Sequence, residues 1–203
     1  MSSDYVGTGR SSQKQRTRNA LVDAARDLIA GGLDPTIEDA ARHASVSRAT
    51  AYRYFATKRE LLIAAHPEIL TTSMLPDDPP ADVSERLDIV VAAFTRLIAD
   101  TEAQQRTMLR LSLEHGPDPT GPLPLRQGRA IGWITEALEP LCAEMSADEL
   151  VGLVHAIRAT TGIEALVWLT DVAGLERVQA AHLMRWSARA LLKCARTDPP
   201  PVD

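Results

Sequence analysis

Apolar residues recur along most of this chain at the three- and four-residue spacing of an amphipathic α-helix. Near the amino terminus, one stripe keeps this spacing over two turns and consists of Leu21, Ala24, Ala25, Leu28 and Ile29. A glycine pair at 31–32 then ends the predicted helix. Similar short stripes predict helices around 36–44, 47–55 and from 57 onward, and no segment alternates as a β-strand would. The pattern therefore predicts an all-α fold.

Capping signals mark the starts of three predicted helices. The spacing of a capping box is found for Thr36 and Asp39 in TIED and for Ser146 and Glu149 in SADE. Ser47 has the residue type of a helix cap and begins the segment 47–55.

The segment PDDPP at 76–80 separates these short helices from longer ones. The apolar stripes that follow predict helices over 83–101, 103–115, 124–143, 147–173 and 176–195, with a proline-rich loop at 116–124. We expect four parts along the chain: a disordered arm at 1–15, a small domain at 16–66, a larger domain at 67–196 and a disordered tail at 197–203.

The charge is divided unevenly between these parts. The chain has a formal net charge of −5, but residues 10–59 hold ten basic and five acidic side chains. A basic segment within an acidic protein indicates one region that meets polyanions and another that does not.

Other classes of function have little support in the sequence. The two cysteines and five histidines show no metal-ligand spacing, and we find no nucleophile–base pair and no glycine-rich phosphate loop. We therefore expect no enzyme, no metal site and no cofactor. No signal peptide is recognisable, and no apolar run is long enough to cross a bilayer, so we expect a cytoplasmic protein with no membrane partner.

The two short helices joined by the residues ASVS at 44–47 have the dimensions of a helix-turn-helix, whose second helix enters the major groove of DNA. Ala51 and Phe55 share one face of this second helix and are expected to pack inward. The outward residues suit the reading of base edges: Arg48 lies in the first turn, Ala49 permits close approach, Thr50 donates or accepts, and Arg53 matches guanine.

Tyr52 and Tyr54 point in nearly opposite directions from this helix, so one phenol is expected to reach the phosphates on each side of the groove. Thr36 and Lys58, at the starts of the neighbouring helices, are expected to add phosphate contacts. A simpler interpretation stays open, because helix pairs with an apolar inner face are common and exposed Arg and Tyr are often only solvated.

Three segments, LVDAARDLIAGG, TIEDAARHASVS and ATAYRYFATKREL, follow one another between residues 17 and 65. In order and spacing they closely resemble the amino-terminal domain of the tetracycline-repressor (TetR) family of bacterial transcription regulators. The resemblance implies a homodimeric, all-helical repressor whose carboxy-terminal domain binds a small effector. Carried over by position, it makes Thr36, Tyr52, Tyr54 and Lys58 phosphate contacts and Arg48, Ala49 and Thr50 base readers.

The carboxy-terminal segment 160–192 resembles the helices through which members of this family dimerise. On that basis we expect an interface that includes Gly162, Ala165, Trp168, Ala181, Ala188 and Leu192. The alternative is that these helices are core helices within one chain.

A further set of residues is predicted to bind the effector: Met108, Leu111, Trp133, Ala137, His155 and Arg158. Packing explains most of the apolar members better, while His155 and Arg158 are equally explained by a dimer salt bridge or by exposure to solvent.

The sequence thus predicts a homodimeric repressor that a small molecule of unknown identity releases from a palindromic double-stranded DNA operator. The alternative is a DNA-organising or partner-binding protein on the same scaffold, with no effector.

Overall fold

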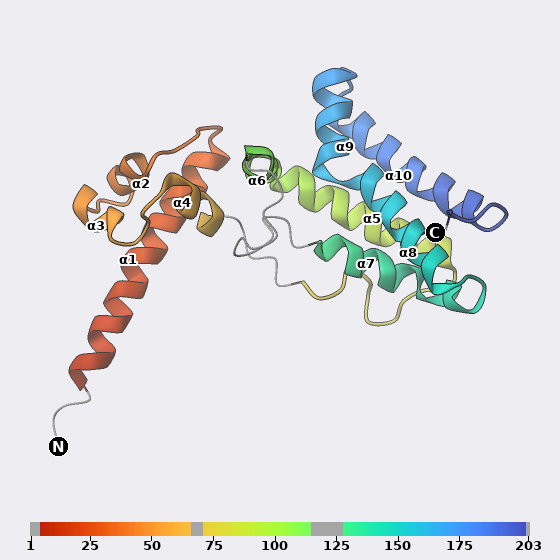
Figure 1. The fold of residues 1–203 in the computed structure, drawn as a ribbon, viewed down its shortest axis with the longest axis horizontal. Coiled ribbons are helices and arrows are strands. Elements are labelled where there is room, and N and C mark those ends of the chain that lie inside the picture. Colours follow the sequence, from red (N-terminus) through yellow and green to blue (C-terminus); the bar gives the residue numbers. More distant parts are fainter. Residues whose placement is uncertain (1–4, 66–70, 115–127, 202–203) are drawn as a thin grey trace. The chain divides into compact units, whose positions relative to one another are not determined.

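The computed structural model describes residues 5–65, 71–114 and 128–201, with side chains from Ser12 onward. Within these ranges it contains helices and no strand, which confirms the predicted fold class (Figure 1). The helices are α1 (Tyr5–Ala30), α2 (Ile37–His43), α3 (Arg48–Tyr52), α4 (Lys58–Ala65), α5 (Val83–Asp100), α6 (Glu102–Glu114), α7 (Arg129–Leu138), α8 (Ala147–Thr161), α9 (Ile163–Val167) and α10 (Arg177–Ala195). A 3₁₀ turn, Glu139–Ala143, follows α7, and a π-helical turn, Trp168–Val172, follows α9.

The chain forms two compact units, and the boundary between them differs from the predicted one. The first unit contains Met1–Glu68 and also Ala103–Leu125, so α6 belongs with α1–α4. The second contains Ile69–Glu102 and Arg126–Asp203. The prediction assigned residues 67–196 to one larger domain. It failed at α6 because Met108 and Leu111 of that helix are buried in the core of the first unit.

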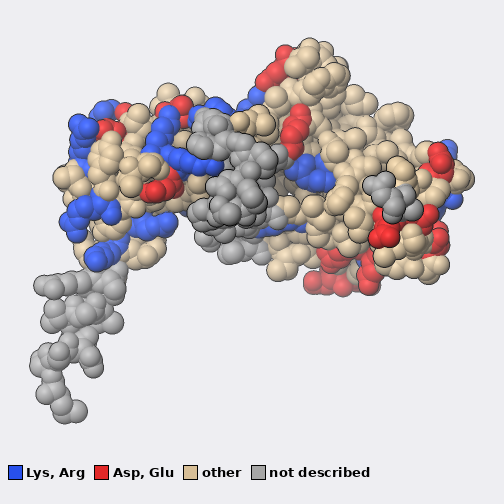
Figure 2. Space-filling view, in the orientation of Figure 1, with Lys and Arg blue, Asp and Glu red and all other residues tan. Residues whose placement is uncertain are grey.

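Lys and Arg side chains are spread over the surface that α1–α4 form, whereas Asp and Glu gather on the second unit (Figure 2). This distribution agrees with the basic balance of residues 10–59 in the sequence.

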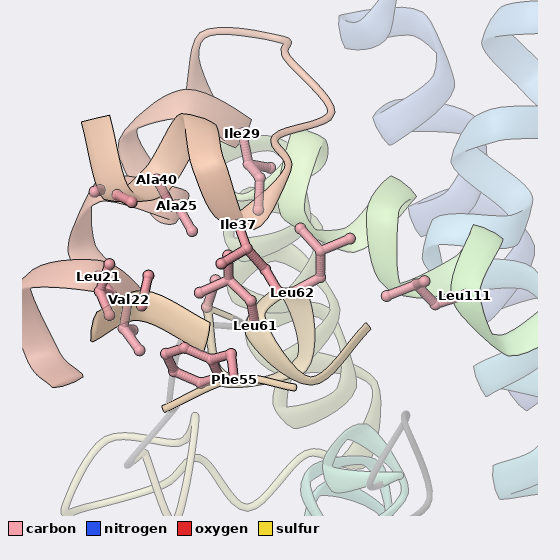
Figure 3. Packing of buried hydrophobic residues seen from close by; sticks show 14 of the residues in the cluster. Leu21, Val22, Ala25, Ile29, Ile37, Ala40, Phe55, Leu61, Leu62 and Leu111 are labelled. Atoms are coloured by element: carbon pink, nitrogen blue, oxygen red, sulfur yellow. The ribbon is translucent and has the colours of Figure 1, made fainter. Parts of the chain in front are cut away.

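The core of the first unit is built from small and branched aliphatic side chains and one phenylalanine. In Figure 3, Leu21 and Val22 of α1 converge with Phe55 and with Leu61 of α4. Helix α1 packs against both α2 and α4, and α2 packs against α3. The last of these contacts fixes how α3 is presented to solvent.

The second unit is a helical bundle in which α5, α7, α8 and α10 pack on one another. A buried arginine closes the end of α7: Arg86 donates hydrogen bonds from Nε to the carbonyl of Ala137 at 3.2 Å and from Nη2 to that of Glu136 at 2.7 Å. These two carbonyls lie in the last turn of α7, and that of Glu136 also accepts a hydrogen bond from the backbone of Glu139.

Helices α8 and α9 are separated by Gly162, whose extended backbone (φ −87°, ψ 179°) interrupts the helical hydrogen bonds. The stretch Ala147–Val172 is long and apolar enough, by length and composition alone, to cross a membrane. The sequence analysis expected no such stretch. The burial of Leu153, Val154 and Ile157 inside the second unit accounts for its apolar character.

Both termini differ from the prediction of disorder. Helix α1 begins at Tyr5, so most of the expected arm is helical. At the other end, Thr197 and Asp198 donate backbone hydrogen bonds to the carbonyl of Cys194, and Pro200 lies against Gly152 of α8. The tail is therefore held against the second unit as far as Pro200.

Candidate nucleic-acid interface

Helix α2 begins at a capping box that the sequence predicted. The Thr36 hydroxyl accepts a hydrogen bond from the backbone of Asp39 at 3.1 Å, and the Asp39 carboxylate accepts one from the backbone of Thr36 at 3.0 Å. The hydroxyl of Thr36 also donates to the Asp39 carboxylate at 2.6 Å. These hydrogen bonds hold the pKa of Asp39 below its usual value, the side chain of Thr36 being the largest cause.

This geometry changes the expectation for Thr36. Its hydroxyl already donates to Asp39 and accepts from the Asp39 backbone, so it donates to a phosphate only if the capping box opens.

The turn between α2 and α3 is short and tightly bonded. Ala44 donates to the carbonyl of Ala40 at 2.9 Å and Val46 to that of Ala41 at 2.8 Å. Ser45 adopts a left-handed conformation, with φ of 55°. This conformation lets the chain reverse before Ser47, whose side chain caps α3 by accepting from the backbone of Thr50 at 3.2 Å.

Helix α3 lies in the unit as its pattern predicted, although it is shorter than the expected 47–55. Ala51 is fully buried and Phe55 is 3% exposed, so the inner face is confirmed. After Tyr52 the chain turns, with Tyr54 and Phe55 both donating to the carbonyl of Ala51. On the outer side Arg48, Ala49 and Arg53 are exposed.

The fourth outward residue, Thr50, is half-buried, and its hydroxyl accepts a hydrogen bond from the hydroxyl of Ser47 at 2.8 Å. A hydroxyl that accepts one bond still has its own proton to donate.

The two tyrosines occupy different environments. Tyr52 is 41% exposed, and its hydroxyl donates to the carboxylate of Glu38 in α2 at 2.8 Å. Tyr54 lies in the turn after α3 and packs, partly buried, against the core of the unit. The pair does not straddle a continuous helix as expected.

Lys58 begins α4, close to the loop that precedes α2. Its ammonium nitrogen lies 2.7 Å from Oδ2 of Asp34. The other oxygen of the same carboxylate receives a hydrogen bond from Arg110 of α6 at 2.9 Å. The position of Lys58 beside α2 and α3 suits a phosphate contact, but in this structure the cation is paired.

Sequence reasoning missed two carboxylates, Glu38 and Asp34. Glu38 was seen only as part of the TIED capping segment, and its partners Arg48 and Tyr52 lie in the next helix. Asp34 carried no signal at all, since its partners are 24 and 76 residues away.

Residues 21–65 match the family model for bacterial regulatory proteins of the tetR family. The match covers the last part of α1 and the whole of α2, α3 and α4, and so includes the exposed face of α3. The chain is therefore a DNA-binding transcriptional regulator, and its residues 21–65 are of the tetR-family type. A comparison with curated proteins found no match.

In this regulator, the apolar residues predicted to bind the effector belong to both units. Met108 and Leu111 are buried in the core of the first unit, whereas Trp133 and Ala137 are buried within the second. That these residues bind an effector stays a prediction. An apolar stripe shows that a helix packs, but not against which neighbour.

The two polar members of the effector set differ from each other. His155 is exposed. Arg158 is half-buried; its guanidinium lies 5.6 Å from the ring centre of Phe94 and 3.4 Å from the Glu164 carboxylate. Phe94 in turn makes an edge contact with Trp133, with ring centres 6.0 Å apart.

The regulator's predicted dimer residues are only partly at its surface. Gly162, Ala188 and Leu192 are buried inside the second unit, so they do not form an outer face and this part of the prediction is wrong. A Cβ at Gly162 would meet the ends of the side chains of Arg158 and Glu164, which would have to shift. Ala165 and Ala181 are half-buried, and Trp168 is 58% exposed.

Proposed function

We propose that this regulator is a homodimeric repressor that binds a palindromic operator through α3 and is released by a small-molecule effector. The observation that carries the proposal is the anchoring of α3. Buried Ala51 and Phe55 fix the helix, and Arg48, Ala49 and Arg53 then point to solvent. Arginine suits guanine, and a small residue allows close approach to a base pair.

Support for a dimer comes from exposed apolar side chains in the second unit. Trp168 and Val172 of the π-helical turn, together with Val178 and Trp186 of α10, are each more than half exposed. Large apolar side chains that are exposed in a single chain, tryptophan above all, are typical of a protein interface. Pairing by two-fold symmetry brings a second copy of α3 to a second half-site.

Support for coupling to an effector comes from α6. Its first residue, Glu102, is held in the second unit by two hydrogen bonds from Arg177, at 2.6 and 3.0 Å. The rest of the helix belongs to the first unit, where Met108 and Leu111 are buried and Arg110 binds Asp34. A ligand that shifts this junction changes the DNA-binding unit without touching DNA, which is the coupling that an inducible repressor requires. The surroundings of Arg158, Phe94 and Trp133 are our candidate for the effector site.

The test begins with selection of bound sites from random duplex DNA by the full-length protein, followed by footprinting of the enriched sequence. A two-fold symmetric footprint, with half-sites about one helical turn apart, is expected. Metabolites that raise the melting temperature are then tested for release of that DNA. A protein that enriches no sequence contradicts sequence-specific regulation. A specific binder that no metabolite releases is instead a DNA-organising or partner-binding protein.

A further inference from the structure

Glu38 connects the two helices of the helix-turn-helix on the side where α3 is exposed. Its Oε1 accepts a hydrogen bond from the hydroxyl of Tyr52 at 2.8 Å and lies 3.0 Å from Nη2 of Arg48. The guanidinium of Arg48 also lies 5.7 Å from the ring centre of Tyr52. One carboxylate therefore holds two residues of α3 that the DNA-binding site would use.

The carboxylate is ionised at neutral pH. The hydrogen bond from Tyr52, a backbone hydrogen bond and the charge of Arg48 together lower the pKa of Glu38. An ionised carboxylate on a DNA-binding surface is repelled by phosphates, so Glu38 weakens binding to any duplex. A negative charge would be unfavourable at this position if its role were only to strengthen DNA binding.

The same contact restricts Arg48, which is otherwise a long, mobile side chain with 74% of its surface exposed. An arginine that is ordered before binding loses less rotamer entropy when it meets a base. The contact with Glu38 uses only Nη2, and a guanidinium has five N–H donors, so donors remain for the O6 and N7 atoms of guanine.

Tyr52 has a different task from the one its position suggested. Its proton is donated to Glu38, so it is not available to a phosphate while this contact lasts. Its ring instead lies beside the guanidinium of Arg48.

We propose that Glu38 is a positioning residue that sets the sequence selectivity of this regulator. It holds Arg48, beside the ring of Tyr52, in the orientation that contacts a guanine. Its negative charge lowers the affinity for every duplex in return. This inference rests on the proposed function, because it requires that α3 reads bases.

The central experiment compares Glu38→Gln with the wild type, using full-length protein, the selected duplex, its single-base variants and a scrambled duplex. The substitution keeps the shape of the side chain and removes its charge. We expect affinity for the scrambled duplex to rise severalfold, and the preference at one guanine position to fall roughly tenfold. The matched control is Asp23→Asn, which removes one charge from an exposed pair with Arg26 in α1; it should leave the preference unchanged.

Two further variants test whether Glu38 acts through its neighbours. In an Arg48→Ala background, Glu38→Gln should cause no further loss of preference. Tyr52→Phe, which removes the hydroxyl but no charge, should reduce the same preference without changing the salt dependence of binding. Circular dichroism melting of each variant checks that the first unit remains folded.

Each other result overturns the proposal. Full preference at every position in Glu38→Gln removes the positioning role. A loss of preference that persists without Arg48 means that Glu38 reads the base itself, and a uniform loss of affinity in Tyr52→Phe returns that hydroxyl to the phosphate. In all these cases the wild type still selects a sequence, so the proposed function survives. A wild type with no sequence preference overturns both.

Discussion

Replacing Lys58 with alanine measures whether the start of α4 binds a phosphate. A lysine that neutralises one phosphate releases one counterion, which contributes about −0.9 to the slope of log affinity against log salt. A dimer uses two copies, so the variant should have a slope that is shallower by roughly 1.8. At about 0.15 M salt, the same relation gives a loss of roughly fivefold per subunit.

The ion pair that Lys58 forms in the structure reduces the loss of DNA affinity expected for this variant. Lys58 is paired with Asp34 at 2.7 Å, and its side chain is 38% exposed. An exposed pair of this kind stabilises the free protein by about 0–1 kcal/mol, and Lys58 gives up this contact when it turns to DNA. The net loss on substitution is therefore between almost none and about fivefold per subunit, or up to roughly thirtyfold for a dimer.

The assay is fluorescence anisotropy with the selected duplex and a scrambled duplex, at several salt concentrations between about 0.05 and 0.3 M. Both duplexes should lose affinity by the same factor, because a phosphate contact carries no sequence information. Lys193→Ala is the matched control, an exposed lysine on α10 in the second unit. Equal salt slopes for the wild type and Lys58→Ala would remove Lys58 from the interface.

Three further substitutions test the second unit, where all three tryptophans report by fluorescence. Trp186→Glu places a charge on the exposed apolar patch and should convert a dimer to a monomer in analytical ultracentrifugation; an unchanged mass would exclude that patch. Gly162→Ala displaces Arg158 and should lower the free energy of unfolding by about 1 kcal/mol without changing the mass. Asp88→Asn removes a carboxylate bound by two arginines and, discounted for its exposure, should lower the free energy of unfolding in urea at pH 7 by about 1–2 kcal/mol. Although burial opposes ionisation, hydrogen bonds from the arginines hold the pKa of Asp88 below its usual value. The loss of unfolding free energy in Asp88→Asn should therefore be full above about pH 5 and shrink as the pH falls below about 4. An equal loss above about pH 5 and below about pH 4 would contradict this reasoning.

The features that the sequence predicted well are those decided by residues close together in the chain. The capping box of Thr36 and Asp39, the cap of Ser47 and the capping box of Ser146 and Glu149 all join residues three apart. The inner face of α3 was also predictable, since the helical repeat places Ala51 and the turn's Phe55 on one side.

The features that could not be predicted depend on which neighbour a helix meets. Helix α10 has two faces with apolar residues, and the sequence analysis chose the one with Ala188 and Leu192 as a partner surface. The structure buries that face and exposes Val178 and Trp186 on the other. Alanine and leucine are common in cores and at interfaces alike, so composition did not distinguish the faces. Large exposed aromatic side chains do, but exposure is known only once the fold is known.

Three carboxylates of the first unit combine both kinds of feature at the DNA-binding face: those decided by residues close together in the chain and those decided by distant neighbours. Asp34, Glu38 and Asp39 lie within six residues, and each binds a residue that the sequence assigned to DNA: Lys58, Arg48 with Tyr52, and Thr36 respectively. A phosphate contact by Thr36, Tyr52 or Lys58 therefore replaces an internal contact, which reduces the free energy that phosphates alone contribute to binding. A base that matches Arg48 adds hydrogen bonds that a mismatched duplex does not supply. Such an arrangement lowers affinity for every duplex and lowers it least for the operator, which raises the ratio of specific to non-specific binding on which regulation depends.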